Sequence, residues 1–546
     1  MNEPEKLHDV AALTEAASAA LDGWLPAKIA ASSIRAATVG VVGPGGLTWS
    51  RGFGSIDGGE TRFVDEETLF CVRSLSKAIT ALGVLLAVQE GLVELDAPIT
   101  EYLPGFMIQT RYEPNPERRV TLRHLLANRA GFTHDEPPGN DPAGPASFEK
   151  RVAAISRTWL RFPVGLRYAY SNLHFDLAGF ILQEVSGDPF PTYMKERVFE
   201  PLGMRASTFD WSEAAARPNL ARGYDPGGAI EGVAIAEAPA AGLYSTVRDL
   251  SEYLRFHIHD GSVVGRQLLR KNLMEEYRTV QFLESGQEAG YCFGIFWQPV
   301  SSTHSLLHSG GGHGYQSQMI VYPELSFGVT FLTNKDGHGL TVGPLQKVVD
   351  DVVRDRLGPD PVAEAPTEGM EELAPDDERV RAVLGRYWEM GDWTLELIDG
   401  VPTLATDSEP PVPVTFYERG EELLGVCGES GLLRFAYPKA CHPSMLLWSD
   451  RRLRNVVYRM RNGGPADPPG PAKPEWDAYC GTYDILWKDV PCDDVRIHVR
   501  NGYLWFDDRR CIEHEPGLFF TCDGEAIDFR SSPQTAANLI LRRQRG

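Results

Sequence analysis

Several features that would place this chain in a particular class are absent from its 546 residues. No two of its eight cysteines stand as C-x-x-C, so zinc-ribbon spacing is missing and buried free thiols are expected. No apolar run approaches the ~20 residues that a membrane span needs. No Lys-Ser/Thr pair follows the glycines near residue 310, which argues against a phosphate loop. We therefore expect no metal, no cofactor and no membrane association.

Positive charge is also scarce in this chain. The formal net charge is −22, which argues against non-specific binding to nucleic acid or to an anionic membrane surface. Residues 1–24 have the pattern of an amphipathic helix, without the basic flank and apolar core of a secretory signal. We expect a cytoplasmic protein that acts on a small-molecule or short-peptide substrate, and homo-oligomerisation stays open.

The length of the chain and two proline-rich stretches predict three domains. Residues 357–379 are rich in proline and acid, and residues 461–475 are rich in proline, glycine and alanine. Both compositions favour exposed, extended chain. The predicted domains are 1–356, 379–462 and 473–546.

The first domain mixes strands with helices. Residues 36–55 predict a hairpin that turns at Pro44-Gly45-Gly46, and residues 318–334 predict another that turns at Pro323-Glu324. Helical patterns dominate from Ser76 to about Phe256, between the two hairpins. A sheet with strands from both ends of a segment and helices between them suits an α/β or α+β domain.

The two smaller domains resemble each other. Gly385-x-Tyr387 and Gly481-x-Tyr483 each precede an alternating strand, an Asp-Gly or Asn-Gly turn, and another strand. Such dipeptides between alternating runs are a strong hairpin signal. We expect two small antiparallel β-barrels that arose by duplication, neither of them with a helix of any length.

A serine and a lysine stand together at the start of an apolar run, in FCVRSLSKAITAL. If a helix begins at or just after Ser74, the side chains of Ser74 and Lys77 share one face. The amine would activate the hydroxyl, and the helix N-terminus would supply N–H groups for an oxyanion. A second S-x-x-K, Ser147 to Lys150, follows a loop and precedes no comparable apolar helix, so we treat it as coincidence.

Two further motifs carry chemistry. Tyr170-Ser171-Asn172 precedes an amphipathic helix that ends at Gly187. Its tyrosine can move a proton and its asparagine can orient an amide, although alone the motif would be an ordinary helix start with asparagine as N-cap. His308-Ser309-Gly310 lies where a strand meets a glycine turn, whose N–H groups can bind an oxyanion; alone it would be a glycine-rich hairpin.

In this order, the three motifs resemble the serine β-lactamase and penicillin-binding-protein superfamily, in its class-C-like branch. The resemblance covers about residues 10–355. It implies an α+β, β-lactamase/transpeptidase-like domain with the active site between an antiparallel sheet and a helical lobe. It further implies that Ser74 is the nucleophile, that Lys77 and Tyr170 share proton transfer, and that Asn172 positions the substrate amide.

The same resemblance assigns the third motif. His308 stands where relatives have lysine, and Ser309 and Gly310 line the substrate site. The oxyanion hole would come from the backbone N–H groups of Ser74 and Gly311. Because a histidine is mostly neutral at pH 7, we expect neither β-lactamase nor D,D-carboxypeptidase activity. NRAGF, residues 128–132, stands where the family commonly has HTSGL and changes that rim of the cleft.

The order of the domains, with two lipocalin-like barrels after the H-x-G motif, is similar to that of the D-aminopeptidases of this superfamily. A D-amino-acid-specific peptidase or amidase is therefore the leading hypothesis. A carboxylesterase, or a transacylase or peptide cyclase of a natural-product pathway, would use the same acyl-enzyme. A binding protein without catalysis is the alternative from another class.

Replacement of Ser74 by alanine tests the predicted nucleophile. Ser74→Ala should lower turnover by about a thousandfold or more and abolish fluorophosphonate labelling, because the covalent step is lost. The fold should survive, since a hydroxyl at a helix mouth contributes little packing. Ser147→Ala is the matched control and should leave labelling unchanged; loss of labelling in this control would show that the wrong S-x-x-K motif was chosen.

Overall fold

The computed structural model forms two compact units that divide near residue 361. The described residues are 3–56, 62–134, 148–225, 228–230, 238–281, 289–360, 367, 369–388, 392–406, 410–419, 422–427, 431–436, 445–450, 456–461, 472–487, 490–500, 502–507, 509–521, 524–531, 534–536 and 539–544. The three domain bounds predicted above stay a prediction, and much of the predicted linker 461–475 lies outside the described residues.

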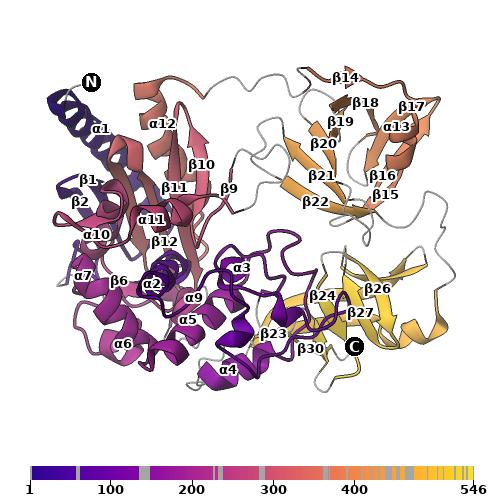
Figure 1. Ribbon diagram of the computed structural model, residues 1–546, viewed down its shortest axis with the longest axis horizontal. Coiled ribbons are helices and arrows are strands. Elements are labelled where there is room, and N and C mark those ends of the chain that lie inside the picture. The colour runs from indigo at the N-terminus through magenta and orange to yellow at the C-terminus, as the bar shows by residue number, and fades with distance from the viewer. Residues whose placement is uncertain are drawn as a thin grey trace. The chain divides into compact units, whose positions relative to one another are not determined.

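The first unit is built on a seven-stranded antiparallel sheet with the order β2-β1-β13-β12-β11-β10-β9 (Figure 1). Its strands are β1 (Ala36–Gly43), β2 (Gly46–Gly54), β9 (Gly290–Tyr291), β10 (Phe296–Val300), β11 (Thr303–Gly312), β12 (Tyr315–Tyr322) and β13 (Phe327–Thr333). Both predicted hairpins form, as β1–β2 and β12–β13. β1 pairs with β13, so strands from both ends of the unit meet in one sheet.

The side chains of this sheet alternate between two hydrophobic cores, as the two-residue period of a strand requires. Val39, Val41 and Phe331 pack against α1 (Glu3–Ala31) and α12 (Gln346–Leu357) on one face, where Figure 1 shows these two helices side by side. Neighbouring residues of the same strands belong to the core of the helical lobe: Val42, Met319, Val321 and Leu332. The expected α+β architecture is therefore confirmed.

The helical lobe surrounds α2 (Ser76–Glu90), which is buried continuously from Ser76 to Ala87. A helix that is apolar on all sides lies in the interior of a domain, so α2 is a rigid element. The helix ends at Gly91, whose φ of 76° forms a left-handed cap. The other helices are α3 (Leu122–Leu126), α4 (Phe148–Ile155), α5 (Asn172–Ser186), α6 (Phe190–Met194), α7 (Glu200–Leu202), α8 (Trp211–Ala215), α9 (Ala238–Ala241), α10 (Val247–Ile258) and α11 (Lys271–Arg278).

Short strand pairs and single turns complete the lobe. The strand pairs are β3 (Phe70–Cys71) with β6 (Tyr244–Ser245), β4 (Tyr224–Asp225) with β5 (Gly228–Ala229), and β7 (Ser262–Val263) with β8 (Arg266–Gln267). A 3₁₀ turn, η1 (Arg73–Leu75), leads directly into α2. None of the described helices is long and apolar enough to cross a bilayer. Cys71, Cys292, Cys427, Cys480 and Cys511 are free thiols, all buried except Cys480.

The described residues of the second unit form two sets of eight antiparallel strands and the short strand β14. The first set is β15 (Gly385–Trp388), β16 (Asp392–Ile398), β17 (Val401–Thr406), β18 (Val412–Arg419), β19 (Glu422–Cys427), β20 (Gly431–Ala436), β21 (Met445–Asp450) and β22 (Val456–Arg461). Each strand pairs with the next and β22 pairs with β15, so the pairings form a ring; β14 (Glu371–Glu372) adds to β18.

The second set closes into an eight-stranded barrel, which confirms the predicted C-terminal β-barrel. Its strands are β23 (Gly481–Trp487), β24 (Val490–Arg500), β25 (Tyr503–Phe506), β26 (Arg509–Glu515), β27 (Leu518–Thr521), β28 (Ala526–Asp528), β29 (Thr535–Ala536) and β30 (Leu539–Arg543). Closure pairs every strand on both sides and so leaves no exposed sheet edge.

The expectation that neither barrel domain contains a helix was wrong in both domains, since a 3₁₀ helix, η7 (Pro474–Ala478), precedes β23 in the second. Helix α13 (Glu378–Val383) precedes β15, and the Asp377 side chain caps it by accepting the N–H of Arg379. Its Val380 and Val383, three residues apart, are buried in the first barrel core. A helix of six residues is too short for a periodic sequence pattern, but two apolar residues at this spacing suffice to bury one face of it.

Truncation near Glu364 tests whether the first unit folds by itself. We expect a soluble, cooperatively melting protein that still reacts with a fluorophosphonate at Ser74, because both cores of this unit lie within residues 13–353. Substrate preference should change while labelling persists. Thermal denaturation and mass spectrometry of the labelled protein measure both results, and complete insolubility would contradict the independence of the unit.

Candidate active site

Lys77 is fully buried in the first turn of α2. Its Nζ lies 2.7 Å from Oδ1 of Asn172, 3.0 Å from the carbonyl oxygen of Ala240 and 3.1 Å from Oγ of Ser74. A buried amine needs an acceptor for each N–H that it carries, because water cannot reach it. These acceptors come from η1, α5 and α9, so Lys77 joins three elements that are far apart in the sequence.

The acceptors around Nζ define what Lys77 can do to Ser74. An amide oxygen and a peptide carbonyl only accept, so Asn172 and Ala240 each take one N–H. An ammonium then donates its third N–H to Oγ of Ser74. A neutral amine has no third N–H and directs its lone pair at the same hydroxyl, which becomes the donor. Both protonation states fit one geometry, which is what proton exchange between two groups requires.

Ser74 lies in η1, two residues before α2 begins at Ser76. The predicted helix start at or just after Ser74 is therefore confirmed. Oγ of Ser76 donates to the carbonyl of Arg73 at 2.5 Å and accepts the N–H of Leu243 at 3.0 Å. These two hydrogen bonds of Ser76 therefore fix the turn that presents the hydroxyl of Ser74.

The Tyr170-Ser171-Asn172 motif starts α5, and its N-cap is Ser171. The Ser171 hydroxyl accepts the N–H of Leu173 at 3.1 Å, which leaves the Asn172 side chain to bind Lys77. The ring of half-buried Tyr170 has its centroid 4.7 Å from Nζ of Lys77, within cation–π range. The ordinary N-cap interpretation therefore applies to Ser171, and the two flanking residues both contact the lysine.

His308 is buried, with 3% of its surface exposed, and its ring packs against those of Tyr170, Tyr291 and Phe296. Its Nδ1 donates to the carbonyl of Ser309 at 2.7 Å, so Nε2 is the acceptor and faces the Tyr291 hydroxyl at 3.4 Å. Burial, with the nearby charge of Lys77, lowers the pKa of His308 to about 3. The imidazole is therefore neutral at physiological pH, and its ring centroid is 6.1 Å from that of Tyr170.

The glycines of the third motif lie inside a strand, not in a turn as predicted. β11 continues to Gly312, which pairs with Tyr315, so the turn is at His313-Gly314, after the three consecutive glycines. The strand persists because β12 pairs with it along this whole stretch. A Cβ on Gly310 would lie 2.3 Å from the carbonyl oxygen of Val72, so glycine is required where β11 crosses the approach to η1.

The free edge of β11 faces the turn that holds Ser74. Pairing with β10 ends at Leu307, and beyond it the carbonyl of Gly311 accepts from Nε of Arg73 at 3.5 Å. The N–H and C=O of one strand residue point to the same side, so the Gly311 N–H also faces η1. This is the orientation that an oxyanion hole shared with the Ser74 N–H would need.

The segment 239–243 contributes to the site and was missed in the motif search. Its backbone receives hydrogen bonds from Thr80 (to Pro239 O, 2.8 Å) and Lys77 (to Ala240 O, 3.0 Å), and Val72 N–H donates to Leu243 O at 2.9 Å. Alanine and glycine carry no reactive or hydrogen-bonding side chain, so the sequence does not mark this segment as part of a site. It is identified only by the hydrogen bonds of its backbone.

A buried ion pair stabilises the same segment. Arg151 and Asp176 are each 1% exposed at their side chains, and Nη2 of Arg151 lies 2.6 Å from Asp176. The second carboxylate oxygen accepts the N–H of Ala240 at 3.1 Å. Burial raises the pKa of Asp176, an effect that the Arg151 charge opposes. Asp176 follows Asn172 by one helical turn, so one face of α5 contacts both Lys77 and helix α9, whose Ala240 carbonyl binds Lys77.

Asn128 belongs to the NRAGF stretch that was expected to form the rim of the cleft, but it is fully buried. Its Oδ1 accepts the backbone N–H of Ser171 at 3.1 Å and Nδ1–H of His174 at 2.8 Å. Burial lowers the pKa of His174 to about 3, so this imidazole is neutral. Asn128 therefore supports the Tyr170-Ser171-Asn172 turn from inside, because a buried carbonyl oxygen must be hydrogen-bonded.

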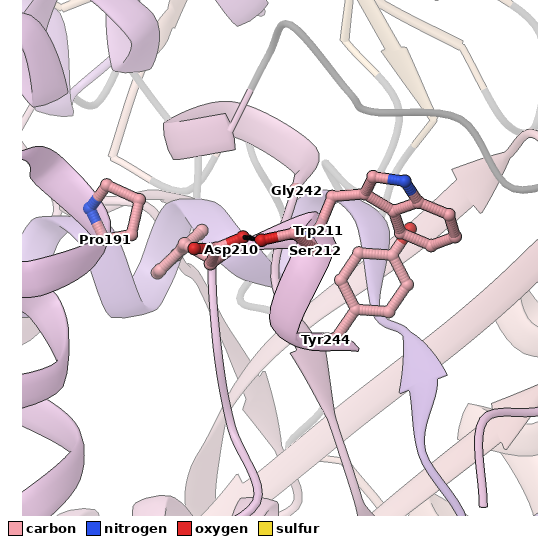
Figure 2. Close-up of a pocket in the computed structure, with 7 residues that line it drawn as sticks. Pro191, Asp210, Trp211, Ser212, Gly242 and Tyr244 are labelled. Carbon is pink, nitrogen blue, oxygen red and sulfur yellow. Dashed lines mark hydrogen bonds between the residues drawn. The ribbon is translucent and has the colours of Figure 1, made fainter. Parts of the chain in front are cut away.

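A pocket of about 300 Å³ lies in the first unit and shares Gly242 with the segment 239–243 (Figure 2). It is lined by Pro191, Phe209, Asp210, Trp211, Ser212, Gly242 and Tyr244. The Asp210 carboxylate is engaged by Ser212 at 2.6 Å, and the Trp211 ring packs at 5.4 Å from that of Tyr244. The lining includes none of the predicted site residues, so the site is defined by its hydrogen bonds and not by this pocket.

Two remaining expectations concern residues outside this cluster. Ser147, in the second S-x-x-K stretch, lies outside the described residues, and α4 begins at Phe148. Within the described part of the chain, no group of three His, Cys, Asp or Glu side chains could hold a metal ion.

Sequence comparison finds distant relatives. Protein flp of Staphylococcus aureus (strain MW2) is 24% identical over 307 residues, which are 55% of this chain and 60% of the relative. The chain thus spans about 60% of the length of this relative, and the match leaves the remainder of both proteins uncompared.

Solved structures share the fold. SurE with D-Leu superposes with a TM-score of 0.55 at 22% identity, over 83% of this chain and 100% of that one. The D-amino acid amidase of Ochrobactrum anthropi SV3 with D-phenylalanine gives a TM-score of 0.50 at 23% identity, over 63% and 98%. The Beta-lactamase family profile matches residues 21–349, which is more than half of the chain and includes all three motifs. The chain therefore belongs to the beta-lactamase family.

Proposed function

We propose that this protein is an acyl-enzyme hydrolase that uses Ser74 to cleave amides of D-amino acids or short peptides that begin with them. The observation that carries the proposal is the contact of fully buried Lys77 with Oγ of Ser74, fixed by Asn172 and Ala240. Burial of the Lys77 amine removes its hydration, and this loss of free energy is offset only because protein acceptors replace the water. Such an arrangement activates a serine that is otherwise a weak nucleophile.

The proposed reaction has two steps. Oγ of Ser74 attacks the substrate carbonyl carbon, its proton passes by way of Lys77 and Tyr170 to the leaving amine, and the C–N bond breaks. Water then attacks the acyl carbon, gives one proton back along the same path and releases Ser74. The N–H groups of Ser74 and Gly311 stabilise the oxyanion in both steps. Tyr170 lies against Lys77 and His308, where a hydroxyl can pass a proton to the leaving group.

The neutral state of His308 supports a preference for amides over free acids. A cation at this position would bind a substrate α-carboxylate, but burial keeps this imidazole uncharged and both its nitrogens are engaged by Ser309 and Tyr291. Structural neighbours described with D-leucine and D-phenylalanine support the D-amino acid assignment. The same site would serve an ester substrate or an amine acceptor, so esterase and acyltransferase activities are the alternatives for the second step.

The panel that tests the proposal is a set of p-nitroanilides of D- and L-amino acids beside p-nitrophenyl esters. Hydrolysis of the D-anilides, lost in Ser74→Ala, is the expected result. Hydrolysis of esters alone would favour the esterase alternative. Absence of both turnover and fluorophosphonate labelling in the wild-type protein would favour a binding protein on this fold.

Tyr170→Phe tests the proton path. The variant should lower kcat by about a hundredfold or more, the range for loss of a proton-transfer group, with little change in melting temperature because one hydroxyl is removed. Tyr193→Phe is the matched control, since its buried hydroxyl donates to Gly83 O at 3.2 Å, outside the site. Activity of Tyr170→Phe within twofold of wild type would remove Tyr170 from the path.

His308→Lys tests the charge argument. For wild type, a D-alanyl peptide amide should have a higher kcat/KM than the matching free acid. A lysine should shift the preference towards the acid by about ten- to a hundredfold, because a charge-assisted bond contributes ~1.5–3 kcal/mol. His304→Lys, four residues earlier on β11, is the control and should change neither value. Equal preference in wild type and His308→Lys would mean that residue 308 does not face the substrate.

A further inference from the structure

Arg73, the residue immediately before Ser74, has a backbone φ of +50°. Left-handed backbone is unfavourable for a residue with a long side chain, because Cβ crowds the following carbonyl oxygen. A glycine would adopt this conformation without cost, yet the chain has arginine here. Strained backbone persists where the surrounding structure enforces it, and it is concentrated at functional sites.

The Arg73 side chain lies between the two walls of the site. Arg73 is 4% exposed, its Nη1 donates to the carbonyl of Ala241 at 3.3 Å, and its Nε donates to that of Gly311 at 3.5 Å. Its Nη2 lies 3.6 Å from the position of a Cβ on Gly312. The guanidinium therefore bridges the segment 239–243 and the free edge of β11, and its planar set of N–H groups suits two carbonyls in different directions.

We propose that Arg73 is a positioning residue for the oxyanion hole: it fastens the β11 edge to the turn that carries Ser74 and so holds the Gly311 N–H towards the reacting carbonyl. This inference rests on the proposed acyl-enzyme function, and it adds a residue that no motif identified. The fixed charge of the guanidinium also lies beside Gly311, where negative charge would develop in the tetrahedral intermediate. Because it acts on the oxyanion and not on the leaving group, Arg73 should matter equally for amide and ester substrates.

The test uses Arg73→Gly, Arg73→Ala and Arg73→Lys in the full chain. Both truncations remove the guanidinium, but only alanine retains the strained backbone, so the glycine variant should melt at a higher temperature than the alanine variant. Both should lower kcat by about ten- to a hundredfold with KM within about threefold, somewhat less than direct loss of an oxyanion donor. Lysine should restore activity only partly, because a point charge cannot bind both carbonyls.

Phenylboronic acid is the probe of the oxyanion hole, since its adduct with a serine places an anionic oxygen there. The dissociation constant of phenylboronic acid should be at least about tenfold higher for Arg73→Gly than for wild type, whatever the natural substrate is. Ser326→Gly is the matched control. Ser326 has a φ of +53° in the turn between β12 and β13, so its replacement should raise the melting temperature without changing kcat or boronate affinity.

Wild-type kcat and boronate affinity in Arg73→Gly would overturn the inference, as would an equal loss of boronate affinity in Ser326→Gly. If Arg73→Ala fails to fold, the glycine and lysine variants still decide the question. Failure of the proposed function has a different signature, because wild-type protein would then bind no boronate at Ser74 and Ser74→Ala would leave binding unchanged.

Discussion

The buried amine of Lys77 is the constraint on which the rest of the site depends. A group with two or three N–H bonds in the interior destabilises the fold unless each bond has an acceptor. Ser74, Asn172 and Ala240 provide those acceptors at 2.7–3.1 Å from three separate elements. Because the N–H bonds of Lys77 find acceptors only when these elements meet, the stability of the lobe and the geometry of the proposed nucleophile Ser74 have the same origin.

The surroundings of Lys77 explain why the elements can meet. The buried helix α2 holds the lysine backbone in place, and glycine at position 310 lets β11 approach the carbonyl of Val72. Asp176, paired with Arg151, binds helix α9 at Ala240, and Asn128, bonded to His174, binds the turn at Ser171. Each support is buried and makes at least one hydrogen bond, and buried hydrogen bonds of this kind help to fix the geometry of a site.

The electrostatics of the site divide between charged and neutral groups. Two basic side chains, Lys77 and Arg73, border Ser74, whereas burial keeps His308 and His174 uncharged at physiological pH. Basic side chains thus lie near Ser74 and the free edge of β11, whereas the imidazole of the third motif is neutral. That distribution suits stabilisation of an oxyanion more than recognition of a substrate carboxylate.

Much of this protein could be predicted from its sequence, because local patterns report local structure. The spacing of Ser74 and Lys77 before an apolar run predicted a helix start, and the two hairpins of the first domain predicted its sheet. The Asp-Gly and Asn-Gly turns predicted one hairpin in each barrel, β16–β17 and β24–β25. The end of strand β11 was predicted less accurately. The glycines after His308 predicted a turn, but pairing with β12 keeps the chain extended to Gly312.

Only the tertiary structure decided which backbone groups and which distant segments contact one another. Ala240 binds Lys77 through a carbonyl that every residue type possesses, so no letter of the sequence marks it. Asn128 changes from a rim residue to a buried support, and Arg73 acquires a left-handed backbone, only when the chain is folded. A sequence determines which side chains are available and which helices and strands can form, whereas burial determines which carbonyls and charges must be satisfied by one another.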